Sequence, residues 1–282
     1  MRVSRGGGQD RRRAVRLISA PDGVRLIVAP GVFAPIGDTW LLARCARRLA
    51  PGARALDLCS GSGAVAVDLA RHGAAAVVAV DVSRRAVLAA RANARLNGVR
   101  VDARRGDLLG AVAGERFDVI VSNPPYVPAR EGGVPRRGPA RAWDAGSDGR
   151  ALLDRILAQA PAALAPGGSL LLVHSSICGE RATLERMRAA GLAATVVARE
   201  PGPLGPLMRE RAQALEARGL LAPGAREESL LVFRGQSTRR RSGTRPPHTA
   251  TSDANTIVAV STSSGIDPAP PRLEARPRHP TT

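Results

Sequence analysis

Asn123-Pro124-Pro125-Tyr126 is the segment of this 282-residue chain whose residue types best suit chemistry. Proline at 124 keeps Asn123 out of the helical region, and two consecutive prolines leave carbonyl groups without nearby N–H partners. The Asn123 side-chain oxygen and the Pro124 carbonyl can then both accept from one planar –NH2 group. The ring of Tyr126, the only tyrosine in the chain, can stack on the same group.

This arrangement suits methyl transfer to nitrogen. The lone pair of an amide or arylamine nitrogen is delocalised, so such a nitrogen is a poor nucleophile. Two acceptors on its hydrogens direct the lone pair toward an electrophilic methyl group. In-line transfer from a sulfonium depends on such positioning and electrostatics. The alternative interpretation is a proline-rich loop with a buried tyrosine.

A second motif, Asp57-Leu58-Cys59-Ser60-Gly61-Ser62-Gly63, lies between an apolar run and a helical pattern. Glycines let a ligand approach the backbone closely, and the following helix offers its N-terminal N–H groups. Asp81 follows the next apolar run, where a carboxylate can bind the ribose hydroxyls of an adenosine cofactor. Asp107 can accept from an adenine amino group. A tight turn, a helix cap at Asp81 and a solvated acid at Asp107 are the alternatives.

Apolar runs alternate with helical patterns, which predicts an α/β fold with one seven-stranded, mostly parallel sheet and helices on both faces. Asp38 or Thr39 is expected to cap the first helix. Strands are predicted over 54–58, 76–80, 99–104, 117–122, 169–174, 192–199 and 229–234, and helices over 37–49, 64–71, 83–97, 150–164, 180–190 and 207–218.

Composition predicts three segments. Residues 1–16 are basic and expected to be disordered, residues 17–235 form the catalytic domain, and residues 236–282 are a disordered tail rich in Ser, Thr, Pro and Arg. The formal net charge is +18, and all 42 basic residues are arginine. The absence of lysine excludes a Schiff base, a P-loop lysine and a lysine base. Only six aromatic residues occur, which disfavours stacking of successive bases.

Cysteine usage and hydropathy address location. Cys45, Cys59 and Cys178 form no CxxC pair, which indicates a reducing cytoplasm and no metal site. No apolar run is long enough for a transmembrane helix, so no membrane association is expected.

Four stretches together resemble the class I S-adenosylmethionine-dependent methyltransferases of the HemK family: 56–63, Val80-Asp81, Gly106-Asp107 and 122–126. That family modifies the glutamine amide in the GGQ motif of translation release factors. Residues 32–42 resemble the V-Y-x-P-x-x-D-T-x-L-L stretch of the short HemK2-like branch. The resemblance covers roughly residues 25–234 and implies a Rossmann-like class I methyltransferase fold.

The resemblance also implies residue roles. It assigns the acceptor nitrogen to Asn123, Pro124, Pro125 and Tyr126. Cys59 departs from the family, which has glycine there, and we expect the change to be tolerated if its φ is negative. The resemblance places S-adenosylmethionine against Thr39, Asp57, Ser60, Gly61, Gly63, Asp81, Asp107, Leu108 and Asn123.

Three functions are compatible with these residues. The first is methylation of a release-factor glutamine, with a small activator protein as a second partner, as in eukaryotic and archaeal relatives. The second is methylation of an exocyclic amine, such as adenine N6, in DNA or RNA, which the basic charge permits but does not require. The third is a non-catalytic cofactor- or RNA-binding subunit. An NAD-dependent oxidoreductase is disfavoured, because the turn lacks GxGxxG.

Several other residues are weaker candidates. His72 is expected to cap a helix C-terminus, and His174 to be a core or strand-end histidine rather than a base. Trp143-Asp144-Ala145-Gly146 either closes over the substrate or anchors its loop. Arg136-Arg137 and Arg141 either meet an acidic partner or RNA, or form a solvated basic loop.

Overall fold

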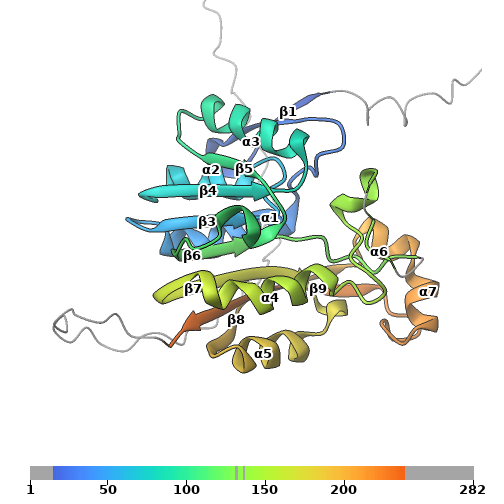
Figure 1. The fold of residues 1–282 in the computed structure, drawn as a ribbon. Coiled ribbons are helices and arrows are strands. Elements are labelled where there is room, and N and C mark those ends of the chain that lie inside the picture. The colour runs from blue at the N-terminus through green and yellow to red at the C-terminus, as the bar shows by residue number, and fades with distance from the viewer. Residues whose placement is uncertain (1–14, 131–132, 136, 239–282) are drawn as a thin grey trace, which may run out of the picture.

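A computed structural model describes residues 15–130, 133–135 and 137–238. The main sheet has seven strands: β3 (Arg54–Leu58), β4 (Ala76–Asp81), β5 (Asp102–Arg105), β6 (Phe117–Ser122), β7 (Leu164–Ser175), β8 (Leu192–Pro203) and β9 (Glu227–Ser237). Their spatial order is β5-β4-β3-β6-β7-β9-β8 (Figure 1). All neighbours are parallel except β9, which runs antiparallel to β7 and β8. The predicted seven-stranded, mostly parallel sheet is confirmed.

Helices cover both faces of this sheet. One face carries α1 (Gly37–Ala46), α2 (Ala64–Arg71) and α3 (Arg84–Leu96), and the other carries α4 (Ala151–Ala163) and α5 (Glu180–Ala189). Side chains alternate between the faces along each strand. Leu56 and Leu58 therefore join the core under α4, whereas Ala55, which directly precedes Leu56, packs in the core under α1 and α2.

The sequence analysis missed a two-stranded antiparallel sheet formed by β1 (Arg16–Ser19) and β2 (Arg25–Val28). Buried Asn93 of α3 holds it in place. Its side-chain amide accepts from the Ile27 N–H at 2.6 Å and donates to the Ile27 carbonyl at 3.0 Å and the Ser62 carbonyl at 2.8 Å. One amide thus ties the hairpin, α3 and the glycine turn together.

Some element limits differ from the prediction. The strand predicted over 99–104 covers only Asp102–Arg105, and α1 ends at Ala46 before a 3₁₀ turn over Arg47–Leu49. The helix predicted over 207–218 is two short helices, α6 (Pro206–Glu210) and α7 (Ala212–Ala217). The break at Arg211 lets its guanidinium bond the Pro128 carbonyl at 2.7 Å.

The expected domain limits fall inside strands, because β1 begins at Arg16 and β9 continues to Ser237. Most of the two segments expected to be disordered, 1–14 and 239–282, lies outside the described residues. Within the described part of the chain, no helix is long and apolar enough to cross a bilayer.

A partly buried ion pair joins the end of α1 to α2. Asp68 is fully buried and receives two hydrogen bonds from the Arg47 guanidinium, at 2.8 and 2.7 Å. Arg47 also pairs with Asp22 in the hairpin connection. These acidic partners raise the pKa of Arg47 further above its ordinary value. The pair therefore fixes α1, which carries part of the site described below.

We predict that Asp68→Ala lowers the free energy of unfolding by about 2–3 kcal/mol, because it removes charged hydrogen bonds from a buried position. The matched control is Asp102→Ala, which removes an exposed pair with Arg104 and is expected to cost less than about 1 kcal/mol. Urea unfolding measures both values. Equal costs for the two variants would contradict the structural role of Asp68.

Candidate active site

The predicted motifs meet in one cavity of about 1010 Å³ at the carboxyl ends of β3, β4 and β6. This size is at the upper end of small-ligand pockets, so it leaves room for more than one ligand. Of the predicted site residues only Gly63 does not line it. The lining includes Thr39, Asp57, Ser60, Gly61, Asp81, Asp107, Leu108, Asn123, Pro124, Pro125 and Tyr126.

The glycine turn depends on left-handed backbone. Gly61 and Gly63 have φ of +53° and +76°. A Cβ on Gly63 would lie 2.8 Å from the Cβ of Ala90 in α3, so only glycine fits between the two helices. The condition on which Cys59 was expected to be tolerated, a negative φ, is not met: its φ is +57°. A non-glycine residue in this region costs about 1–2 kcal/mol, which the surrounding structure must offset.

Two features of the turn fit a polar ligand. The Ser60 hydroxyl is buried and has no hydrogen-bond partner among the described residues, although buried polar groups are normally bonded. A Cβ placed on Gly61 would meet nothing within 4 Å, so the backbone faces open space there. An adenosine cofactor bound in the cavity would supply the hydroxyl with its missing partner.

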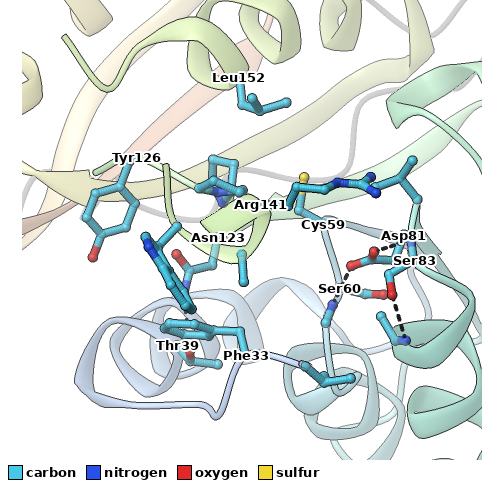
Figure 2. Close-up of a pocket in the computed structure, with 18 of the residues that line it drawn as sticks. Phe33, Thr39, Cys59, Ser60, Asp81, Ser83, Asn123, Tyr126, Arg141 and Leu152 are labelled. Carbon is cyan, nitrogen blue, oxygen red and sulfur yellow. Dashed lines mark hydrogen bonds between the residues drawn. The ribbon is translucent and has the colours of Figure 1, made fainter. Parts of the chain in front are cut away.

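The carboxylates of Asp57 and Asp81 lie at the floor of the cavity, at the ends of adjacent strands. Asp57 accepts from the Ala66 N–H at 3.1 Å, and Asp81 accepts from the N–H groups of Gly61 at 2.9 Å and Ser83 at 2.8 Å (Figure 2). Burial raises the pKa of Asp57 to about 8, against the Ala66 hydrogen bond and with a further rise from the charge of Asp81. Burial also raises the pKa of Asp81.

Asp107 and Leu108 form one rim of the cavity. Asp107 is exposed and pairs with Arg155 of α4 at 2.7 Å. Leu108 is buried with a φ of +49°, a strained conformation for a branched residue that places it against the cavity. The ribose and adenine contacts assigned to Asp81 and Asp107 stay predictions.

At the other end of the cavity, a chain of hydrogen bonds fixes Asn123. Its side-chain Nδ2 donates to the Thr39 hydroxyl at 3.1 Å, and this hydroxyl donates to buried Asp38 at 3.1 Å. Figure 2 shows the Asn123 amide turned with its nitrogen toward Thr39. Among the described residues, neither Asn123 Oδ1 nor the Pro124 carbonyl receives a hydrogen bond, so both acceptors are available to a ligand.

Asp38 also anchors Tyr126, whose hydroxyl donates to it at 2.8 Å. Burial and the Asp38 charge raise the pKa of Tyr126 well above its ordinary value, so the phenol stays neutral. The predicted cap at Asp38 or Thr39 is wrong, because α1 begins at Gly37 with Ile36 at the N-cap and no side-chain cap bond. Asp38 instead lies inside the first turn, where it accepts the Thr39 N–H at 2.6 Å. Gly149 backs the motif: a Cβ there would lie 2.2 Å from the Tyr126 carbonyl.

The cavity-lining residues that the sequence analysis did not assign to the site include two carboxylates, Glu228 and Asp38. Glu228 of β9 accepts from the Ser175 hydroxyl and from the Gly205 N–H, the latter at 2.6 Å, and so holds the start of α6 at the cavity. The hydrogen bond from Tyr126 to Asp38 was not predicted either, although Asp38 directly precedes Thr39, a predicted site residue. No local sequence signal marks Glu228.

The two histidine candidates, His72 and His174, both have structural roles. His72 is the C-cap residue of α2, as predicted. His174 is fully buried, bonds Thr183 at 2.8 Å and lies outside the cavity lining; burial lowers its pKa to about 4. It is the core histidine that was expected.

The loop after the motif is anchored by its contacts. Asp144 pairs with Arg211 at 2.6 Å, and Trp143 packs beside Val127 while also lining the cavity. Arg141 lines the cavity, and its charge partly offsets the rise that burial causes in the pKa of Asp81. Arg137 is exposed, whereas Arg136 lies outside the described residues. Within the described ranges, no three His, Cys, Asp or Glu side chains are grouped to hold a metal ion.

Comparison with known proteins shows that the chain is similar to methyltransferases. Residues 23–134 match the methyltransferase small domain family. The chain is 34% identical over 187 residues to a putative protein N5-glutamine methyltransferase of Methanocaldococcus jannaschii, covering 66% of this chain and 94% of that protein. It is 41% identical over 157 residues to the release factor glutamine methyltransferase of Geobacter sulfurreducens, covering 53% of this chain and only 55% of that protein.

Among solved structures, the Mtq2–Trm112 complex of E. cuniculi, described as responsible for methylation of the translation termination factor eRF1, has a similar fold. Its TM-score is 0.52 at 22% identity, with 73% of this chain and 99% of that chain covered. The fold is therefore that of class I methyltransferases, and S-adenosylmethionine is the cofactor that the cavity accommodates.

We predict that S-adenosylmethionine binds more tightly as the pH rises through about 8. The free protein then loses the proton of Asp57, and an ionised carboxylate at the cavity floor attracts the cationic cofactor. The affinity is expected to rise about tenfold more in the wild type than in Asp57→Asn between pH 7 and 9. Calorimetry at several pH values measures this.

The Asp57→Asn variant is the internal control, since the cofactor's own titration affects both proteins equally. Parallel pH profiles for the two proteins would remove Asp57 from the cofactor site.

Proposed function

We propose, since the chain belongs to the family of S-adenosylmethionine-dependent protein N5-glutamine methyltransferases, that it methylates the side-chain amide of a glutamine in a peptide chain release factor. The observation that carries this proposal is the pair of acceptors at Asn123 Oδ1 and the Pro124 carbonyl, which receive no hydrogen bond from the described residues. A glutamine side chain ends in a planar –NH2 group with two hydrogens for these two oxygens.

The residues at the acceptor end position the amide, and the proton that the nitrogen loses after methylation passes to water. S-adenosylmethionine supplies an electrophilic methyl group when it is bound. Asn123 and Pro124 hold the two amide hydrogens, which directs the nitrogen lone pair away from them. Tyr126 remains neutral because of its raised pKa and offers its ring face to the planar amide.

The surroundings of the acceptor end suit a protein loop. Beyond the motif, the cavity lining includes Val134, Trp143 and Pro206 at the start of α6. Six large apolar side chains of the described residues are exposed, and three of them, Ile36, Val82 and Val134, line this cavity. An acceptor peptide entering here would cover apolar surface that is otherwise exposed to water.

The remaining partners are part of the same proposal. A small activator protein is the second expected partner, and the cytoplasm, where translation ends, is the expected location. The chain spans about half of the Geobacter sulfurreducens enzyme. The substrate of that enzyme therefore cannot simply be assigned to this chain, and the substrate must be tested with this chain.

The deciding experiment measures transfer of a tritiated methyl group to purified release factors, tRNA, rRNA and DNA side by side. We expect label in a release factor and none when the GGQ glutamine is replaced by glutamate, which lacks the amide nitrogen. Each reaction is run with and without a candidate activator protein. Labelling of nucleic acid alone would reject the protein acceptor and favour methylation of an exocyclic amine.

We predict that Asn123→Ala lowers the rate of methyl transfer at least about 100-fold, because one of two groups that orient the acceptor is lost. Cofactor affinity is expected to change less than about threefold, because Asp57 and Asp81 remain. Single-turnover transfer and calorimetry measure the two effects separately. Weakened cofactor binding with normal transfer in the residual complex would contradict the acceptor role.

A further inference from the structure

One edge of the molecule carries arginine with almost no acidic residue to balance it. Seven arginines and one acid, Asp102, occur between residues 82 and 105, which form α3 and the edge strand β5. Asp102 pairs with Arg104, so it neutralises none of the other six. In Figure 1, α3 and β5 lie together at the β5 end of the sheet.

The arginines of this edge point to solvent with uncompensated charge. Arg84, Arg95 and Arg100 are exposed and have no partner among the described residues. Arg91 and Arg105 are exposed and bond only the carbonyls of Ala103 and Val82, which leaves their charge in place. Arg25 of the neighbouring β2 likewise bonds the Leu96 carbonyl. We call the set Arg25, Arg84, Arg91, Arg95, Arg100 and Arg105 the arginine edge.

The other side of the sheet shows that this pattern is local. On α5, Arg181 pairs with Glu185 at 3.2 Å and Arg186 pairs with Asp154 at 3.2 Å. Arg199 of β8 pairs with Glu180 at 2.7 Å. On this side, among the described residues, only Arg188 of α5 is exposed without an acidic partner, so most of the arginine charge is paired there, whereas in α3 and β5 most of it is not.

The chemistry of the arginine edge favours one of three possible ligands: a protein, a membrane surface or a phosphate-bearing molecule. Stable protein interfaces need buried aromatic or aliphatic anchors, and α3 exposes one large apolar side chain, Leu88. Insertion into a membrane surface needs an apolar helix face, but that of α3, including Val87 and Ala90, is buried on the sheet. Guanidinium groups without apolar anchors match phosphate oxygens, which they bind in pairs.

We propose that the arginine edge binds the phosphate backbone of a nucleic acid without reading its bases. No aromatic side chain lies on it for base stacking, so contacts are with phosphates alone. Arg84, Arg95 and Arg100 do not line the catalytic cavity. Docking of this kind is therefore separable from methyl transfer and independent of which acceptor the enzyme modifies.

The test is fluorescence anisotropy of the full chain with an RNA strand and a DNA duplex, each of two unrelated sequences, over a range of salt concentrations. We expect sequence-independent binding that weakens with salt. In the variant R84A/R95A/R100A, affinity should fall at least about tenfold, and the log–log salt slope should flatten by about two for the single strand. Methyl transfer to a free protein acceptor should be unchanged.

The matched control is R181A/R186A/R188A on α5, which removes the same charge and leaves the arginine edge intact. It is expected to keep wild-type affinity. Equal losses in the two variants would show that net charge or the basic termini bind nucleic acid, and would overturn the proposal. Displacement of the RNA by polyglutamate at equal charge concentration would also overturn it, because the edge would then accept any polyanion.

Discussion

The arrangement proposed for catalysis depends on one hydrogen bond, from the Asn123 side-chain Nδ2 to the Thr39 hydroxyl. An asparagine amide can point either its oxygen or its nitrogen at a ligand, and only the oxygen accepts from an –NH2 group. The Thr39 hydroxyl donates its hydrogen bond to Asp38, so its oxygen is left as the acceptor for Asn123. A buried carboxylate at the start of α1 therefore determines which way the acceptor motif faces.

The fold brings these groups together from distant parts of the chain. Parallel β3, β4 and β6 end at the same edge, which gathers Asp57, Asp81 and Asn123 around one cavity. Behind the motif, Gly149 lets the following loop pack directly on the Tyr126 carbonyl. Beyond it, Glu228 of antiparallel β9 holds the start of α6 at the acceptor end.

Local signals in the sequence predicted much of this arrangement. Apolar runs identified the seven strands, and the proline pair and the glycine turn identified both ends of the cavity. Contacts between residues that are far apart in the sequence could not be predicted from such local signals. The β1–β2 hairpin is held by Asn93, some 66 residues from Ile27 in the chain. Arg211, at the break between α6 and α7, bonds the Pro128 carbonyl 83 residues away, and nothing near Glu228 in the sequence marks it as a cavity residue.

Cys59 shows the limit of a resemblance read from sequence. Its side chain fits the turn, but its left-handed φ of +57° places a cost on the fold that glycine would avoid. The turn keeps its geometry because Asp81 bonds the Gly61 N–H and Gly63 packs directly on α3. Neighbouring contacts thus hold a conformation that the residue itself disfavours.

The most direct test of the Asp38–Thr39–Asn123 chain is the single-turnover rate of methyl transfer in Thr39→Val and Thr39→Ser, compared at saturating S-adenosylmethionine. Valine has the shape of threonine without the hydroxyl, whereas serine keeps the hydroxyl. The account predicts a loss of about 100-fold for valine and less than about fivefold for serine. A valine variant that transfers methyl groups at the wild-type rate would contradict it.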